Sequence, residues 1–236
     1  MIRFDAHRRR LKSAHGDGPA SGDVGGGLSG AQMSWCRSGH GGGADRVVTG
    51  PWWAAVADGV GSLPGSWRIA AAAVASIASE LSPMLTPRDG VSPHLEGLPE
   101  RLFSQAWSEG VAAATRTESS HLAATLTVAL IDVVEETVTY GWVGDSPGGL
   151  WLPDGSLQIV TNAHVDGSGQ LERALTPRRA VQWQQATVRL PEGTAVWVAS
   201  DGAVPSGLGY VPRESLVEAW TARRSADDAA VAVVWP

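Results

Sequence analysis

The sequence predicts an α+β fold, a four-layer α/β/β/α sandwich of two antiparallel sheets flanked by helices. Two observations lead to this expectation. From residue 123 onward, strand-like segments follow one another as hairpins, and the helix-like segments are grouped instead of alternating with single strands. Alternating units would predict a parallel sheet, whereas consecutive hairpins predict antiparallel ones. The length of 236 residues, 43% of them hydrophobic, suits one globular domain.

The first 30 residues are predicted to be a flexible tail. They are rich in glycine, serine, alanine and charge and show no hydrophobic periodicity. The start is basic, but no apolar stretch follows it, so we expect no secretory signal. The folded domain is therefore expected to span residues 31–236.

Two strands and two helices are expected in the first half of the domain. Residues 31–37, AQMSWCR, form the first strand, and residues 51–58, PWWAAVAD, are so continuously apolar that both faces should be buried. The alanine-rich stretch 66–81 predicts a helix with Ser66 as its N-cap, and residues 100–116 predict a second helix. We expect the two helices to be antiparallel neighbours on one sheet.

The second half predicts three hairpins, a late helix and a closing strand. Each hairpin joins two apolar segments through a short turn rich in glycine, aspartate or glutamate. The pairs are 123–134 with 137–145, 148–153 with 156–161, and 186–191 with 194–201. Residues 212–224 predict the late helix, and residues 229–235 predict the final strand.

Charge and composition exclude several classes of protein. The formal net charge of −6 argues against a nucleic-acid partner. No apolar run approaches the roughly 18 residues that a membrane helix needs. The single cysteine, Cys36, excludes an internal disulfide framework. We therefore expect a monomeric cytoplasmic protein.

Four aspartates occupy the same kind of position, at the boundary of a predicted strand. They are Asp58, Asp145, Asp201 and Asp227. Strand ends are fixed in space, so carboxylates placed there can converge. Carboxylates held together repel one another unless a cation neutralises them, and all-oxygen ligation favours Mg²⁺ or Mn²⁺. A plain turn role explains any one of these residues, but it explains the four together less well.

The same segments resemble a known family. The stretches AVADGVGSLPGSWRIA, TLTVALID…YGWVGDSPGGLW, WVASDGAVPS and DDAAVAVVW occur in the order found in the PPM family, the metal-dependent protein phosphatases of the PP2C type. The similarity is closest to compact bacterial members and covers roughly residues 34–235. The order of the four blocks is much more specific than any single block.

The resemblance implies a role for each strand-end residue. Asp58 resembles the carboxylate that bridges two metal ions, and the carbonyl of Gly59 resembles a further ligand. Asp201 and Asp227 resemble the ligands of the second ion, and Asp145 resembles the residue that helps to hold a third ion in bacterial members. The cofactor implied is thus Mg²⁺ or Mn²⁺, as two or three ions.

The resemblance also implies where phosphate is handled, and here the chain departs from the family. Asp45 resembles the acidic residue that orients the attacking water. The family's usual phosphate-binding arginine is replaced by His40, although Arg37 and Arg46 lie nearby in sequence. An arginine usual after the GDS block is Pro147. The flap segment between the GD and SDG blocks is short and matches weakly.

The implied function is hydrolysis of phosphomonoesters on proteins by a Ser/Thr phosphatase, with a phosphorylated protein as substrate and a Ser/Thr kinase among the partners. Asp58, Asp45 and Asp201 are its predicted catalytic residues. The departures at His40 and Pro147 leave open an inactive PPM-fold protein that binds a phosphoprotein or a kinase. A weaker alternative is a serine hydrolase, because GDSPG matches a nucleophile elbow, with Asp154 and His164 as partners; that motif requires a helix after the serine.

Overall fold

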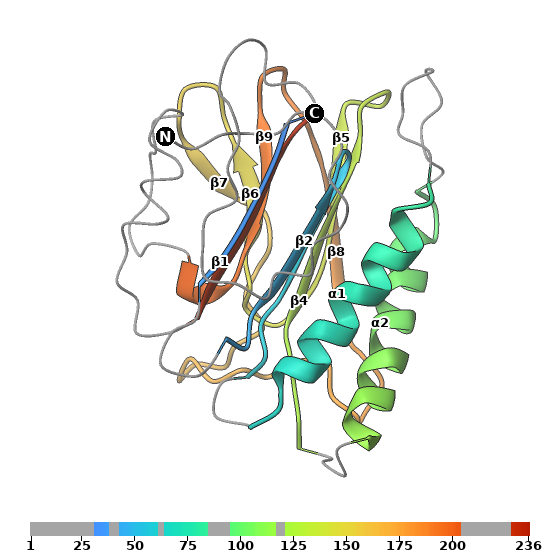
Figure 1. The fold of residues 1–236 in the computed structure, drawn as a ribbon. Helices are drawn as coiled ribbons and strands as arrows, with labels where there is room; N and C mark the ends of the chain where they lie inside the picture. The colour runs from blue at the N-terminus through green and yellow to red at the C-terminus, as the bar shows by residue number, and fades with distance from the viewer. Residues whose placement is uncertain (1–30, 38–42, 61–63, 85–94, 117–120, 204–227) are drawn as a thin grey trace.

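A computed structural model describes residues 31–37, 43–60, 64–84, 95–116, 121–203 and 228–236. Its strands form two five-stranded antiparallel sheets that face each other, and helices α1 and α2 cover the outer face of one of them (Figure 1). The predicted α+β class with two antiparallel sheets is confirmed. The predicted tail, 1–30, and the predicted late helix, 212–224, lie outside the described residues.

The first sheet has the strand order β1-β10-β9-β6-β7. Its members are β1 (Ala31–Arg37), β10 (Ala229–Trp235), β9 (Ala195–Ala199), β6 (Gly148–Trp151) and β7 (Leu157–Ile159). The final strand pairs with the first over its whole length, from Ala31 opposite Trp235 to Arg37 opposite Ala229. The first and last described strands are therefore adjacent.

The second sheet has the strand order β2-β3-β4-β5-β8. Its members are β2 (Arg46–Gly50), β3 (Trp53–Ala57), β4 (Leu126–Asp132), β5 (Thr137–Val143) and β8 (Gln184–Arg189). Every residue of β3 and β4 is buried, as expected for strands covered on both faces. The sequence prediction missed β2, which is short and only partly buried.

Helices α1 (Trp67–Leu81) and α2 (Leu98–Thr115) pack against each other as antiparallel neighbours on the second sheet (Figure 1), as predicted. Alanines let α1 lie close to the sheet, and Ile69, Ile77 and Phe103 bury their side chains in the common core. Ser66 is the N-cap residue of α1, as predicted, but its side chain makes no capping hydrogen bond. The buried Ser66 hydroxyl instead accepts a long hydrogen bond, 3.4 Å, from the backbone N–H of Ala123.

The third predicted hairpin is also wrong. Strands β8 and β9 are joined by a short turn at Gly193, yet β8 pairs with β5 in one sheet and β9 pairs with β6 and β10 in the other. The chain crosses between the sheets at this turn. Among the described helices, none combines the length and the apolar character that crossing a membrane requires.

Candidate metal and catalytic centre

Three of the predicted carboxylates follow buried strands. Asp58 comes directly after β3, and Asp145 follows β5 after one glycine. Asp201 follows β9 after one serine and begins a short 3₁₀ turn. Because these strands belong to both sheets, their ends bring carboxylates from distant parts of the sequence into one region.

Asp45 lies near Asp58 and Asp201 and is only 1% exposed. Burial raises the pKa of its carboxyl from 3.8 to about 6; contacts with the side chains of Asp58 and Ser200 oppose the rise, while the charges of Asp228 and Asp201 add to it. Four aspartates from four separate segments are thus close enough to influence one another electrostatically.

Asp145 joins the same group through Asp201. Burial raises the pKa of Asp145, the charge of Asp201 raises it further, and the nearby His164 lowers it. The structure therefore places Asp45 near Asp58 and Asp201, and Asp145 near Asp201. Such a cluster has the electrostatics of a cation site, because a bound cation removes the repulsion.

Asp228, one residue after the predicted ligand Asp227, has a clear structural contact. Its carboxylate accepts hydrogen bonds from the backbone N–H groups of Gly43, at 3.3 Å, and Ala44. These bonds hold the segment that carries Asp45 against the start of β10. Asp227 itself lies outside the described residues.

A buried hydroxyl network links the Asp58 and Asp145 segments. The backbone N–H of Asp58 donates to Thr125 Oγ1 at 3.1 Å, and the N–H of Thr125 donates to the carbonyl of Asp58 at 2.8 Å. Thr125 Oγ1 also shares a 2.6 Å hydrogen bond with Ser146 Oγ, next to Asp145. Thr127 Oγ1 donates to the carbonyl of Ser146 at 2.6 Å. These contacts fix the relative position of the two aspartates, and the sequence prediction did not identify them.

His164 anchors the start of the predicted flap segment under the loop that carries Asp145. Its Nδ1 accepts a 3.1 Å hydrogen bond from the backbone N–H of Gly144, which places the ring proton on Nε2. The backbone N–H of His164 donates to the carbonyl of Gly144 at 2.9 Å. The ring stacks on Trp142 with centroids 6.2 Å apart.

Replacing His164 with leucine should destabilise the protein by about 1–3 kcal/mol, because it leaves the N–H of Gly144 without its acceptor in a buried place. Asparagine at the same position can present its side-chain oxygen near the former Nδ1 and should retain more of the stability. Urea unfolding of both variants measures the difference. Equal stability of the leucine variant and the wild type would contradict this role for the ring nitrogen.

The backbone at Gly59, the predicted carbonyl ligand, is tightly enclosed. A Cβ at this position would lie 2.7 Å from both the carbonyl carbon of Ser66 and the backbone nitrogen of Trp67. A glycine is required here because the start of α1 approaches the chain directly. The absence of a side chain at Gly59 thus makes room for the backbone at the start of α1.

The predicted phosphate contacts are only partly within the described residues. His40 lies outside them, and Arg37 is the last residue of β1. Arg46 is described, and its Nη1 donates to the carbonyls of Gly43 at 2.7 Å and Asp45 at 2.6 Å. These bonds hold the Arg46 guanidinium beside the segment that carries Asp45.

The serine hydrolase alternative does not fit the structure. Ser146 is buried, and strand β6, not a helix, follows it. Its hydroxyl bonds to Thr125. Asp154 instead binds the backbone and hydroxyl of Ser156 in an exposed turn.

The donor atoms of the centre suit a hard cation, since they are carboxylate oxygens. Within the described part of the chain, no three His, Cys, Asp or Glu side chains are grouped closely enough to hold an ion. A complete ligand set would include Asp227, which is outside that part. The described carboxylates are thus of the chemical type that Mg²⁺ or Mn²⁺ prefers, and they supply part of the ligand set.

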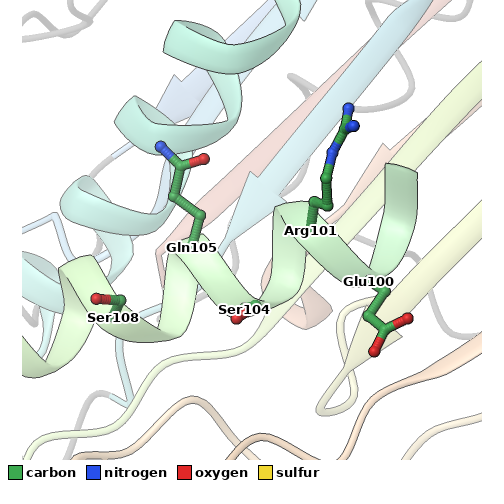
Figure 2. Close-up of a pocket in the computed structure, with 5 residues that line it drawn as sticks. All are labelled: Glu100, Arg101, Ser104, Gln105 and Ser108. Carbon is green, nitrogen blue, oxygen red and sulfur yellow. The ribbon is translucent and has the colours of Figure 1, made fainter. Parts of the chain in front are cut away.

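A surface depression elsewhere on the molecule is unrelated to the carboxylates. It is lined by Glu100, Arg101, Ser104, Gln105 and Ser108, all on helix α2 (Figure 2). None of these residues belongs to the predicted site. The depression is open and carries no group suited to phosphate chemistry other than one arginine.

Comparison with known proteins gives the sequence family and the structural relatives. The family model of protein phosphatase 2C matches residues 43–230. No curated protein is significantly similar to the chain in sequence. Among solved structures, PppA, described as a key regulatory component of T6SS in Pseudomonas aeruginosa, superimposes with a TM-score of 0.66 and 17% identity, covering 86% of this chain and 95% of PppA.

A second similar structure is the serine/threonine phosphatase PstP of Mycobacterium tuberculosis, with a TM-score of 0.64, 19% identity and coverage of 86% of this chain and 96% of PstP. The PstP catalytic domain in complex with two manganese ions gives a TM-score of 0.63 at 19% identity, with coverage of 86% and 96%. At these identities the structural matches establish the shared fold, and the family match covers most of the chain.

Proposed function

Because this chain belongs to the protein phosphatase 2C family, we propose that it is a metal-dependent phosphatase that hydrolyses phosphorylated serine and threonine side chains of proteins. The observation that carries the proposal is the convergence of Asp45, Asp58, Asp145 and Asp201, which the family pattern and the pKa shifts both support. The fold alone would not suffice, since one fold hosts many functions.

The family depends on metal, and one structural relative contains two manganese ions. In the proposal, Asp58, Gly59, Asp201 and Asp227 hold two ions of Mg²⁺ or Mn²⁺, and Asp145 contributes to a third. Such a pair supplies an activated water and neutralises charge on the phosphoryl oxygens.

The chain's own residues then have distinct tasks. Asp45, buried and with a pKa near 6 in the metal-free protein, is placed to accept a hydrogen bond or a proton from the attacking water at its carboxylate oxygens. Thr125 and Ser146 keep the Asp58 and Asp145 segments in register. His40 and Arg37 provide a weak phosphate contact in place of the family's arginine.

The proposal extends to partners and compartment. The substrate is a phosphorylated protein, and a Ser/Thr kinase is a partner suited to this activity. We propose a cytoplasmic monomer without nucleic-acid or membrane binding.

The direct test is hydrolysis of an aryl phosphate with Mn²⁺ at pH values from about 6 to 9. The expected result is measurable turnover that EDTA removes and that added Mn²⁺ restores, because even a poor phosphate contact affects mainly the KM. If no Mn²⁺-dependent turnover appears, the enzyme proposal fails. The alternative, a PPM-fold protein that binds a phosphoprotein or a kinase without turnover, would then take its place, as the Pro147 departure favours.

A further inference from the structure

Beside the carboxylate centre lies an arginine–tryptophan surface made of the half-buried Arg46 and the exposed Trp67 and Arg68. We propose that this surface binds acidic side chains that flank the phosphorylated residue of a protein substrate. The inference rests on the proposed function, because it assigns the class of substrate that the centre would receive.

Arg46 and Trp67, which belong to different elements, both lie next to residues of the carboxylate centre. Arg46 follows Asp45 in the sequence and begins β2. Trp67 begins α1, and its backbone nitrogen is the group that approaches Gly59, next to Asp58. A substrate chain that presents a phosphorylated side chain to the aspartates therefore has this surface within reach of its neighbouring residues.

The ring of Trp67 holds the two cations together. The guanidinium carbon of Arg46 lies 5.5 Å from the ring centroid, and that of Arg68 lies 5.1 Å from it, both within the range of cation–π attraction. Trp67 is 39% exposed, and among the described residues it is the one large aromatic side chain that is exposed. A tryptophan at this position keeps two like charges close together on the surface.

Among the described residues, the two arginines of this surface contact neutral or aromatic groups. Within the described residues, neither Arg46 nor Arg68 forms an ion pair, whereas Arg101 pairs with Glu80 and Arg189 pairs with Glu136. The bonds from Arg46 go to neutral carbonyl oxygens. In a chain of net charge −6, these two guanidinium groups, which make no salt bridge to a described carboxylate, form a local positive site beside the carboxylate centre.

An acidic peptide is the partner that matches this chemistry. Guanidinium groups bind carboxylates and phosphates through paired, charge-assisted hydrogen bonds, and tryptophan adds rigid contact area. Two arginines on a protein of strong negative net charge are too few for nucleic acid, whose binding scales with the number of phosphates neutralised.

Two fluorescein-labelled serine peptides test the proposal without requiring catalysis. One carries glutamates on both sides of the serine, and the other carries glutamines. Fluorescence polarisation at low salt should show the glutamate peptide binding about fivefold more tightly, since rim charges contribute modestly and are screened by salt. Arg68→Glu should remove the preference. Arg46 is left intact because it also holds backbone carbonyls.

The matched control is Arg189→Glu, which makes the same charge change at an exposed arginine of β8. It should keep the preference for the glutamate peptide. Equal binding of the two peptides by the wild type, or equal loss in both variants, would overturn the proposal.

Hydrolysis of aryl phosphate by the same preparations is a separate readout, so failure of the phosphatase proposal is distinguishable from failure of this one. With active enzyme, Arg68→Glu should raise the KM for the phosphorylated glutamate peptide about threefold and leave aryl phosphate hydrolysis within twofold.

Discussion

Replacing Asp58 with asparagine is expected to reduce Mn²⁺-dependent aryl phosphate hydrolysis by at least about 10²-fold. Loss of an outer-shell partner of a metal ligand typically costs 10–100-fold in metal affinity or activity, and Asp58 is the proposed bridging ligand itself. An amide keeps the shape of the side chain but removes the negative charge that would hold the cations.

The fold should survive this change. The backbone of Asp58 is held on both sides by Thr125, through the 3.1 Å bond to its hydroxyl and the 2.8 Å bond from its N–H. Neither bond uses the Asp58 carboxylate. Removal of one charge from a group of repelling carboxylates should leave the metal-free protein as stable as the wild type, or more so.

Activity and metal binding are measured together in this comparison. The Asp58→Asn variant should lose both turnover and the rise in melting temperature that Mn²⁺ gives the wild type. Asp154→Asn is the matched control, because it changes an exposed aspartate in the β6–β7 turn and should leave both unchanged. An Asp58→Asn variant that keeps more than a tenth of the activity would remove Asp58 from the proposed ligands.

The sequence predicts most strands because their apolar residues match the buried positions that these strands occupy. Strand β3 is almost entirely apolar and is buried on both faces, and the β4–β5 hairpin is joined by a short polar turn. The segment of β2, RVVTG, is too short to display an alternating hydrophobic pattern. It forms a strand because it pairs with β3.

The sequence does contain a signal that β8 and β9 do not form a hairpin. Every residue of β9 is buried, whereas β8 carries glutamines, a threonine and an arginine and is largely exposed. The two strands of a hairpin belong to one sheet and tend to be buried to a similar extent. A polar strand followed by a wholly apolar strand therefore favours membership of different sheets, with β8 at an edge.

The sequence draws attention to the charged residues of the proposed centre but not to the residues that support them. Asp58, Asp145 and Asp201 are conspicuous because a carboxylate follows an apolar strand. Thr125 and Ser146 are not conspicuous, since a threonine beside a buried strand looks like an ordinary strand former. Their hydrogen bonds join segments 67 and 21 residues apart, and such contacts depend on tertiary packing.

Asp45→Asn is expected to stabilise the metal-free protein by about 3 kcal/mol above pH 6, and to give little advantage near pH 4. Burial raises the pKa of Asp45 from 3.8 to about 6. At about 1.4 kcal/mol for each tenfold change in proton affinity, this shift corresponds to about 3 kcal/mol. The folded state binds the proton more tightly, so the contribution of Asp45 is fully present below pH 3.8 and is lost as the pH rises to about 6. Asparagine cannot ionise and escapes this loss.

Urea unfolding of metal-free wild type and Asp45→Asn between pH 4 and 8 measures the effect of the Asp45 carboxyl, including its influence on the neighbouring carboxyls. The difference in unfolding free energy should grow from pH 4 to about 6 and then stay level. Asp154→Asn supplies a control of opposite sign: contacts with Ser156 lower the pKa of Asp154, so its loss should destabilise the protein above pH 4. If the difference in unfolding free energy between Asp45→Asn and the wild type does not vary with pH, ionisation of Asp45 does not destabilise the folded state, and the prediction is wrong. Saturating Mn²⁺ should shrink the advantage of asparagine, since a cation beside Asp45 stabilises the ionised carboxylate and leaves the asparagine unaffected.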